Sequence, residues 1–117
     1  MIRHEKEHGS INVNANVYTE IVGVAVSNCF GVKGMAARSA IDGVYHLLRK
    51  EAVGKGVKVQ FHEDNSISID LHIIVDYGVN LNAVGASIIS EVRYVVTNTT
   101  GTEVREVNVY VDSMVIG

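Results

Sequence analysis

Apolar and polar residues alternate along two neighbouring stretches in the middle of the chain. Every second residue is apolar from Val57 to Phe61 and again from Ile67 to Tyr77, and a short polar connection at 63–66 joins the two stretches. Successive side chains of a strand point to opposite faces of a sheet, so each stretch predicts a strand with one packed face. Together they predict an antiparallel hairpin. On its second strand we expect an inward row made of Ile67, Ile69, Leu71, Ile73, Val75 and Tyr77.

Two other stretches repeat apolar residues every three or four positions, which is typical of amphipathic helices. The first helix is predicted to begin after an N-cap at Asn14 or Asn16 and to end near Phe30. The second is predicted to begin after Asn80 and to stop at Gly101. The core-facing residues are expected to be Val17, Ile21, Val24, Ala25 and Cys29 in the first helix, and Leu81, Val84, Ile88, Ile89, Val92, Val95 and Val96 in the second.

The remaining segments complete the predicted order of elements. Short alternating stretches at 10–13 and 102–116 predict a first and a last strand, and Val104 is out of phase with Val107, which indicates either a bulge or a late start of the strand. Residues 1–9 are expected to form a polar, mobile leader, and 35–48 to hold an optional short helix. We therefore predict one α+β domain over residues 10–117. Its order is β-α-(α)-β-β-α-β, with a mixed sheet and two long amphipathic helices on one face.

Composition narrows the classes of protein to which the chain can belong. Its 117 residues are 47% hydrophobic, which suits a single domain with one core. The formal net charge of −3 provides no global attraction to nucleic acid or to anionic lipid. No apolar run approaches the roughly 20 residues that cross a bilayer, and the N-terminus lacks the apolar segment of a secretory signal. We therefore expect a cytoplasmic protein without direct membrane insertion.

Candidate chemistry is sparse. The five histidines are scattered over different predicted elements, and no metal-ligand spacing occurs among them. Cys29, the single cysteine, is expected to be a buried and inert thiol. The acidic residues fall at turns and at outward strand positions, so solvation accounts for them. We assign no catalytic residue, no metal site and no cofactor, and we expect that the protein is not an enzyme.

A G-x-x-G pattern at Gly31, Lys33 and Gly34 offers an alternative of another class. It matches the backbone clamp of KH-type RNA-binding domains, and several basic residues follow it in the sequence. Such a clamp requires a helix that begins directly after the loop. The simpler interpretation is a helix stop, in which one glycine ends the helix and the other reverses the chain.

Three segments resemble the alkaline shock protein family of Gram-positive bacteria, also called envelope stress response proteins. They are Gly56-Val57-Lys58-Val59, the stretch from Ile69 through Asp70-Leu71-His72 to Gly78, and the stretch from Thr100 through Gly101-Thr102 to Val111. With the first helix included, the resemblance covers residues 10–113. The chain departs from the family pattern at Asn28-Cys29-Phe30 and in its histidine-rich leader.

The resemblance implies a protein without enzymatic activity that functions through contacts. It implies a cytoplasmic accessory protein of the stress response that self-associates into a homo-oligomer and that, in some members, is held at the inner membrane face by a membrane-anchored partner. A second setting that it implies is regulation of fatty acid or phospholipid metabolism by binding a lipid-synthesis enzyme. Nucleic acid is not among the implied partners.

The predicted architecture suggests where such contacts form. Two helices can cover only one face of the sheet, so the opposite face is expected to be open. On that face we expect a partner-binding surface formed by His72, Ile74, Asn108 and Tyr110. The edge strand is a competing interface, because its unpaired backbone groups can recruit another strand.

Overall fold

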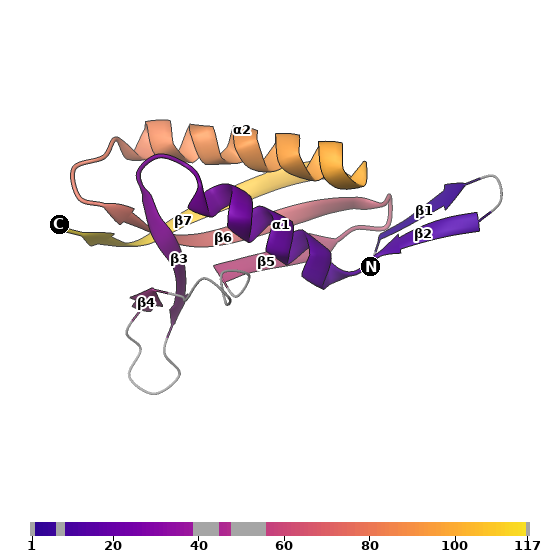
Figure 1. Cartoon of the computed structure of the whole chain (residues 1–117), viewed down its shortest axis with the longest axis horizontal. Helices are drawn as coiled ribbons and strands as arrows, with labels where there is room; N and C mark the ends of the chain where they lie inside the picture. Colours follow the sequence, from indigo (N-terminus) through magenta and orange to yellow (C-terminus); the bar gives the residue numbers. More distant parts are fainter. Residues whose placement is uncertain (1, 7–8, 39–44, 48–55, 117) are drawn as a thin grey trace.

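The computed structural model describes residues 2–6, 9–38, 45–47 and 56–116. The elements in chain order are β1 (Ile2–Lys6), β2 (Gly9–Val13), α1 (Ala15–Ser27), β3 (Val32–Arg38), β4 (Tyr45–Leu47), β5 (Val57–Phe61), β6 (Ser66–Asp76), α2 (Leu81–Thr100) and β7 (Glu103–Val115). Both helices lie on one side of a mixed sheet, and the β1–β2 hairpin projects from one end (Figure 1). This architecture confirms the predicted α+β fold class.

Strand β6 is the centre of the sheet. β7 pairs with it in parallel from Ser66↔Glu103 to Asp76↔Val115 and so occupies one of its edges over the whole length. The other two strands that pair with β6, β3 and β5, therefore share its other edge. β5 pairs antiparallel with 67–71, which confirms the predicted hairpin, and β3 pairs antiparallel with 73–75.

Two irregularities interrupt the pairing of β6 with β7. Between the pairs Ile67↔Val104 and Ser68↔Glu106 the register shifts by one residue, which leaves Arg105 as the inserted residue. Of the two alternatives that the sequence left open, this shift shows the bulge, since β7 already begins at Glu103. A second shift, between Ile73 and Ile74, makes Asp112 an inserted residue.

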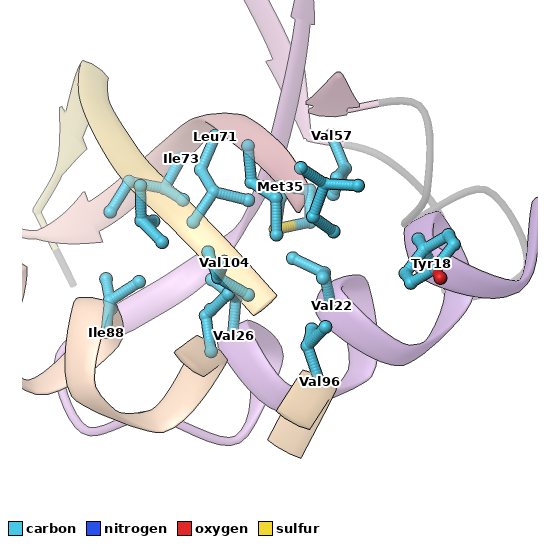
Figure 2. Packing of buried hydrophobic residues seen from close by; sticks show 14 of the residues in the cluster. Tyr18, Val22, Val26, Met35, Val57, Leu71, Ile73, Ile88, Val96 and Val104 are labelled. Atoms are coloured by element: carbon cyan, nitrogen blue, oxygen red, sulfur yellow. The ribbon is translucent and has the colours of Figure 1, made fainter. Parts of the chain in front are cut away.

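The core lies between the helices and the inward row of β6. Figure 2 shows Val22 of α1 and Ile88 of α2 pointing toward Leu71 and Ile73 of β6. The fully buried residues of the predicted inward row are Ile67, Ile69, Leu71, Ile73 and Val75. Tyr77 was expected to belong to this row but is 68% exposed, because β6 ends at Asp76 and the chain turns there.

Helix α2 begins and ends where the sequence predicts. The Asn80 side chain accepts a hydrogen bond from the backbone N–H of Ala83, and Gly101 ends the helix in the left-handed conformation. The buried residues of α2 are Val84, Ile88, Val92 and Val96. Leu81, which we expected in the core, is 41% exposed because it lies in the first turn, at the margin of the buried layer.

Helix α1 is rotated relative to our prediction. Asn14, one of the two predicted candidates, is its N-cap, and the helix ends at Ser27 instead of near Phe30. Val17 is 41% exposed and Val24 is 57% exposed. The buried residues are Tyr18, Val22, Gly23, Ala25 and Val26. The helix is apolar on more than one side, so spacing alone does not fix its orientation. The observed orientation places the Tyr18 hydroxyl in the interior, where it forms a hydrogen bond with the Thr102 hydroxyl at 2.6 Å.

Two strands replace the optional short helix that we expected within 35–48. Residues 35–38 belong to β3, and 45–47 form β4, which pairs with β3. The rest of that expectation, at 39–44 and 48, lies outside the described residues. The first part of β3 finds backbone hydrogen-bond partners at 73–75 of β6, an edge that β5 leaves open, and 36–38 find theirs in β4.

The N-terminal segment also differs from our expectation of a polar leader. Residues 2–6 form β1, which pairs antiparallel with β2 from Ile2↔Val13 to Lys6↔Gly9. Ile2 is 1% exposed and belongs to the core. His4 Nε2 lies 3.2 Å from the Thr102 hydroxyl, which also bonds to Tyr18. The buried side chain of Ile2 and the contact of His4 with Thr102 thus attach β1 to the domain.

Candidate protein interface

The outward face of the sheet, opposite the helices, carries polar and aromatic side chains from the two central strands. Alternation sends Asp70 and His72 of β6 to this face, because Ile69, Leu71 and Ile73 point into the core. The parallel register places Asn108 beside Asp70 and Tyr110 beside His72. Three of the four residues predicted for partner binding are therefore brought together. We call Asp70, His72, Asn108 and Tyr110 the outward cluster.

An aromatic stack forms the centre of the outward cluster. The rings of His72 and Tyr110 lie 4.9 Å apart between centroids and only 14° from parallel. His72 Nδ1 is 3.0 Å from a carboxylate oxygen of Asp112. Tyr110 is 46% exposed, so the stack presents an aromatic surface to solvent, while the contact with Asp112 holds the His72 ring in place.

Hydrogen bonds hold the polar residues around this stack. Asn108 Nδ2 donates to Asp70 Oδ1 at 2.9 Å and to Glu106 Oε1 at 3.2 Å. Nearer the hairpin turn, His62 Nε2 lies 2.6 Å from the Ser68 hydroxyl. These side chains already have partners, so a molecule that binds here meets an ordered surface and loses little conformational entropy in ordering it.

Ile74 does not contribute to this surface, which corrects our prediction. Its side chain is only 3% exposed. In the sheet Ile74 pairs with Gly34 of β3 and Ser113 of β7. Alternation along β6 showed the face to which Ile74 points but could not show its burial.

The G-x-x-G segment is not followed by a helix. Gly31 adopts a positive φ of 85°, and strand β3 begins at the next residue. Lys33 lies 3.9 Å from Asp76, and Gly34 pairs with Ile74 within the sheet. The segment is a helix stop that enters a strand, so it lacks the helix on which an RNA clamp depends. A side chain at Gly31 would also meet Val84, 3.0 Å from an added Cβ.

Among the described residues, two titratable groups have perturbed pKa values. Burial raises the pKa of the Cys29 thiol, and the negative charge of Glu91 raises it further. Such a thiol stays protonated and is a poor nucleophile. Hydrogen bonds from Ser66, assisted by Arg105, lower the pKa of Asp64 to about 2. Within the described part of the chain, no three His, Cys, Asp or Glu side chains gather in a way that could hold a metal ion.

A groove between the helices is a feature that sequence reasoning missed. It has a volume of about 470 Å³ and is lined by Glu20, Ile21, Val24, Ala25, Asn28, Glu91 and Val95. We call it the α1–α2 groove. Its apolar α1 residues are ones that we assigned to the core. The signal was present in the sequence as an apolar face at helical spacing, but it was attributed to internal packing.

The fold and this surface define a class: a small α+β domain with a two-helix layer on one side of the sheet and an ordered aromatic and polar cluster on the other. The chain belongs to the alkaline shock protein 23 family, which is described as having a cell envelope-related function and whose family model matches residues 3–116. This membership confirms the resemblance seen in the sequence.

Relatives from Gram-positive bacteria are similar over nearly the whole chain. "Uncharacterized protein YloU" of Bacillus subtilis is 37% identical over 92% of this chain and 90% of its own length. "Uncharacterized protein Spy1614" of Streptococcus pyogenes is 35% identical over 97% of this chain and 93% of its own length. "Uncharacterized protein YqhY" of B. subtilis is 34% identical, over 92% and 79%. No solved structure matches the chain. Across the described residues, neither helix has the length and apolar character needed to span a bilayer.

Proposed function

We propose that this protein is a non-enzymatic accessory protein of the cytoplasm that serves the cell envelope by binding other proteins. The observation that carries the proposal is the outward cluster, an ordered and solvent-facing aromatic stack on a sheet face that no described helix covers. The family's cell envelope-related function supports the setting.

The outward cluster has the physical properties of a binding surface. Tyrosine is enriched among the residues that dominate binding energy, because its ring buries a large apolar area and its hydroxyl can still hydrogen-bond. The contact of His72 with Asp112 and the bond between Asn108 and Asp70 fix the neighbours of Tyr110 before any partner arrives. Binding then loses less side-chain entropy than it would on a flexible surface.

The proposal includes self-association and a partner at the membrane. A homo-oligomer would present several copies of the outward cluster together and so increase avidity for an anchored partner. The partner class that we favour is a membrane-anchored protein, which would place the chain at the inner membrane face. A lipid-synthesis enzyme is the other partner class, and the same surface would bind it.

The test compares two tyrosines that are both exposed. Tyr110→Asp introduces a charge at the outward cluster, and Tyr77→Asp makes the same change in the turn after β6, where Tyr77 is 68% exposed. We expect Tyr110→Asp to weaken self-association and partner capture at least about tenfold, since aromatic anchors commonly contribute that much. Tyr77→Asp should leave both unchanged.

The measurements are light scattering of the full chain and affinity capture from the producing bacterium, with membrane-anchored proteins and lipid-synthesis enzymes scored as separate classes. Circular dichroism must show that both variants keep the fold. Equal capture and equal mass for the two variants would refute the outward cluster as the binding surface.

A further inference from the structure

The α1–α2 groove has an apolar floor, and no described residue covers it. Val24 is 57% exposed and Val17, two turns earlier on the same side of α1, is 41% exposed. Ile21 lies between them, and Val95 of α2 forms the opposite wall. A further hollow of about 450 Å³ lies between the helices and the β1–β2 hairpin, and its lining residues are His4, Ile11, Asn12, Val13, Val17, Thr99, Thr100 and Gly101. The α1–α2 groove therefore follows the seam between the helices, and Val17 lies where this seam meets the hairpin.

Spacing along α1 shows what shape of partner fits this seam. Val17, Ile21 and Val24 repeat at intervals of four and three residues, which forms a continuous stripe on a helix. Such a stripe normally packs against another element, and here the buried stripe of α1 is a different one, formed by Tyr18, Val22 and others. A helix laid along the seam would complete the packing of a second apolar stripe.

Charge decides the chemistry of the partner. Each wall of the groove carries one carboxylate, Glu20 on α1 and Glu91 on α2, and among the described residues no basic side chain lines it. Arg93, the basic residue of α2, points away, because its guanidinium donates to the carbonyl oxygens of Val104 and Arg105 at 2.7 and 3.2 Å. The rim of the groove is therefore acidic around an apolar floor.

The same acidic rim argues against two other occupants. A second copy that presented this face would bring like charges together, which costs free energy at an interface. An anionic membrane surface would be repelled by Glu20 and Glu91, whereas membrane-binding helical surfaces carry basic residues on their polar face.

We infer that the α1–α2 groove binds an amphipathic helix of a partner protein, with apolar residues on Ile21, Val24 and Val95 and basic residues beside Glu20 and Glu91. This inference rests on the proposed function, that the protein works by binding other proteins. It adds a second surface, on the opposite side of the sheet from the outward cluster, and states which kind of segment that surface accepts.

The test uses two synthetic helical peptides of about 15 residues, close to the span of α1. Both carry leucines at helical spacing; one has lysines beside the leucine stripe and the other has glutamates at the same positions. Binding to the full chain is measured by fluorescence anisotropy of labelled peptide. We expect the lysine peptide to bind at least about tenfold more tightly than the glutamate peptide, and the difference to shrink as salt is added.

Three variants locate the binding. Val24→Asp should weaken the lysine peptide about tenfold or more, and Glu20→Lys with Glu91→Lys should reverse the preference between the two peptides. Tyr110→Asp, which alters the outward cluster, should leave peptide binding unchanged. Glu20 and Val24 are exposed, so the fold should persist, and circular dichroism checks this.

Equal binding of the two peptides, no binding of either, or a preference that survives the charge reversal overturns the inference. So does a change of oligomeric mass on Val24→Asp without peptide binding, because a second copy would then be the occupant. If the peptides fail while Tyr110→Asp still abolishes partner capture, the groove is refuted and the proposed function stands.

Discussion

Asp112 is the inserted residue of the second bulge in β7, and its carboxylate lies 3.0 Å from Nδ1 of His72. A bulge opposes two residues to one on the neighbouring strand and so redirects a side chain. Here it brings a carboxylate to the side of the histidine ring while Tyr110 stays in register and stacks on the ring face. The ordering of the aromatic stack is thus a local consequence of one extra residue.

Asp64, in the hairpin turn, has a pKa well below its ordinary value. Its carboxylate accepts hydrogen bonds from the hydroxyl of Ser66 at 2.6 Å, from the Ser66 backbone N–H at 3.1 Å and from Arg105 at 3.0 Å. These bonds favour the charged form and lower the pKa from 3.8 to about 2. The stabilisation is present above the ordinary pKa and is lost as the pH falls toward 2.

We therefore expect Ser66→Ala to raise the Asp64 titration midpoint back toward its ordinary value, because its strongest hydrogen bond is removed. The midpoint is measured by NMR from the carboxyl chemical shift of Asp64. A range from about pH 6 to about pH 1.5 covers both the charged and the protonated form. Arg105→Gln should raise the midpoint less. An unperturbed midpoint in the wild-type chain would contradict this geometry.

At the scale of single elements, α1 shows how an apolar helix can present two different stripes. The stripe with Val22 and Val26 packs into the core, while the stripe with Ile21 and Val24 faces the α1–α2 groove. Periodicity indicates a helix in both cases but does not state which stripe is internal. The stripe with Val22 and Val26 is the internal one, and in this orientation the buried Tyr18 hydroxyl has a hydrogen-bond partner in the Thr102 hydroxyl.

The orientation of α1 can be tested with two valines on the same helix. Val26 is fully buried, so Val26→Ala should lower the free energy of unfolding by about 1.5–3 kcal/mol. Val24→Ala should change it by no more than about 0.5 kcal/mol, as is usual for exposed positions. Urea denaturation of both variants measures the difference. Comparable losses, or a larger loss for Val24→Ala, would contradict the orientation of α1 in the structure.

At the scale of the whole molecule, the β1–β2 hairpin is attached to the core at its base. Ile2 is buried in the main cluster, and the Thr102 hydroxyl joins His4 of β1 to Tyr18 of α1. Thr102 itself lies just before β7 and is 1% exposed. Three segments that are distant in sequence therefore meet at one buried hydroxyl.

This attachment predicts that the first strand contributes to stability. Ile2→Ala should lower the free energy of unfolding by about 2–4 kcal/mol, the usual cost of truncating a buried isoleucine. Ile11→Ala, on the paired strand where Ile11 is 54% exposed, is the matched control and should have little effect. Thermal unfolding of the full chain measures both. An effect of Ile2→Ala as small as that of the control would show that the strand is not part of the cooperative unit.

The sequence by itself determined the local elements of this protein. Alternation from Val57 to Phe61 and along β6 identified the central hairpin. Helical spacing identified both helices, and Asn80 and Gly101 marked both ends of α2. It also placed His72, Asn108 and Tyr110 on one face. These features depend on residues close in the chain, whose spacing directly reports a period of 2 or 3.6.

Only the tertiary structure decided the features that depend on which segments become neighbours. Ile74 is buried although its position in the alternation resembles that of partly exposed neighbours, and Met35 belongs to a strand because it pairs with Ile73 of β6. The orientation of α1 follows from a partner for Tyr18 that lies 84 residues away. Contacts at such separation leave no periodic signal in the sequence, because they arise from packing of completed elements rather than from the spacing of residues within one element.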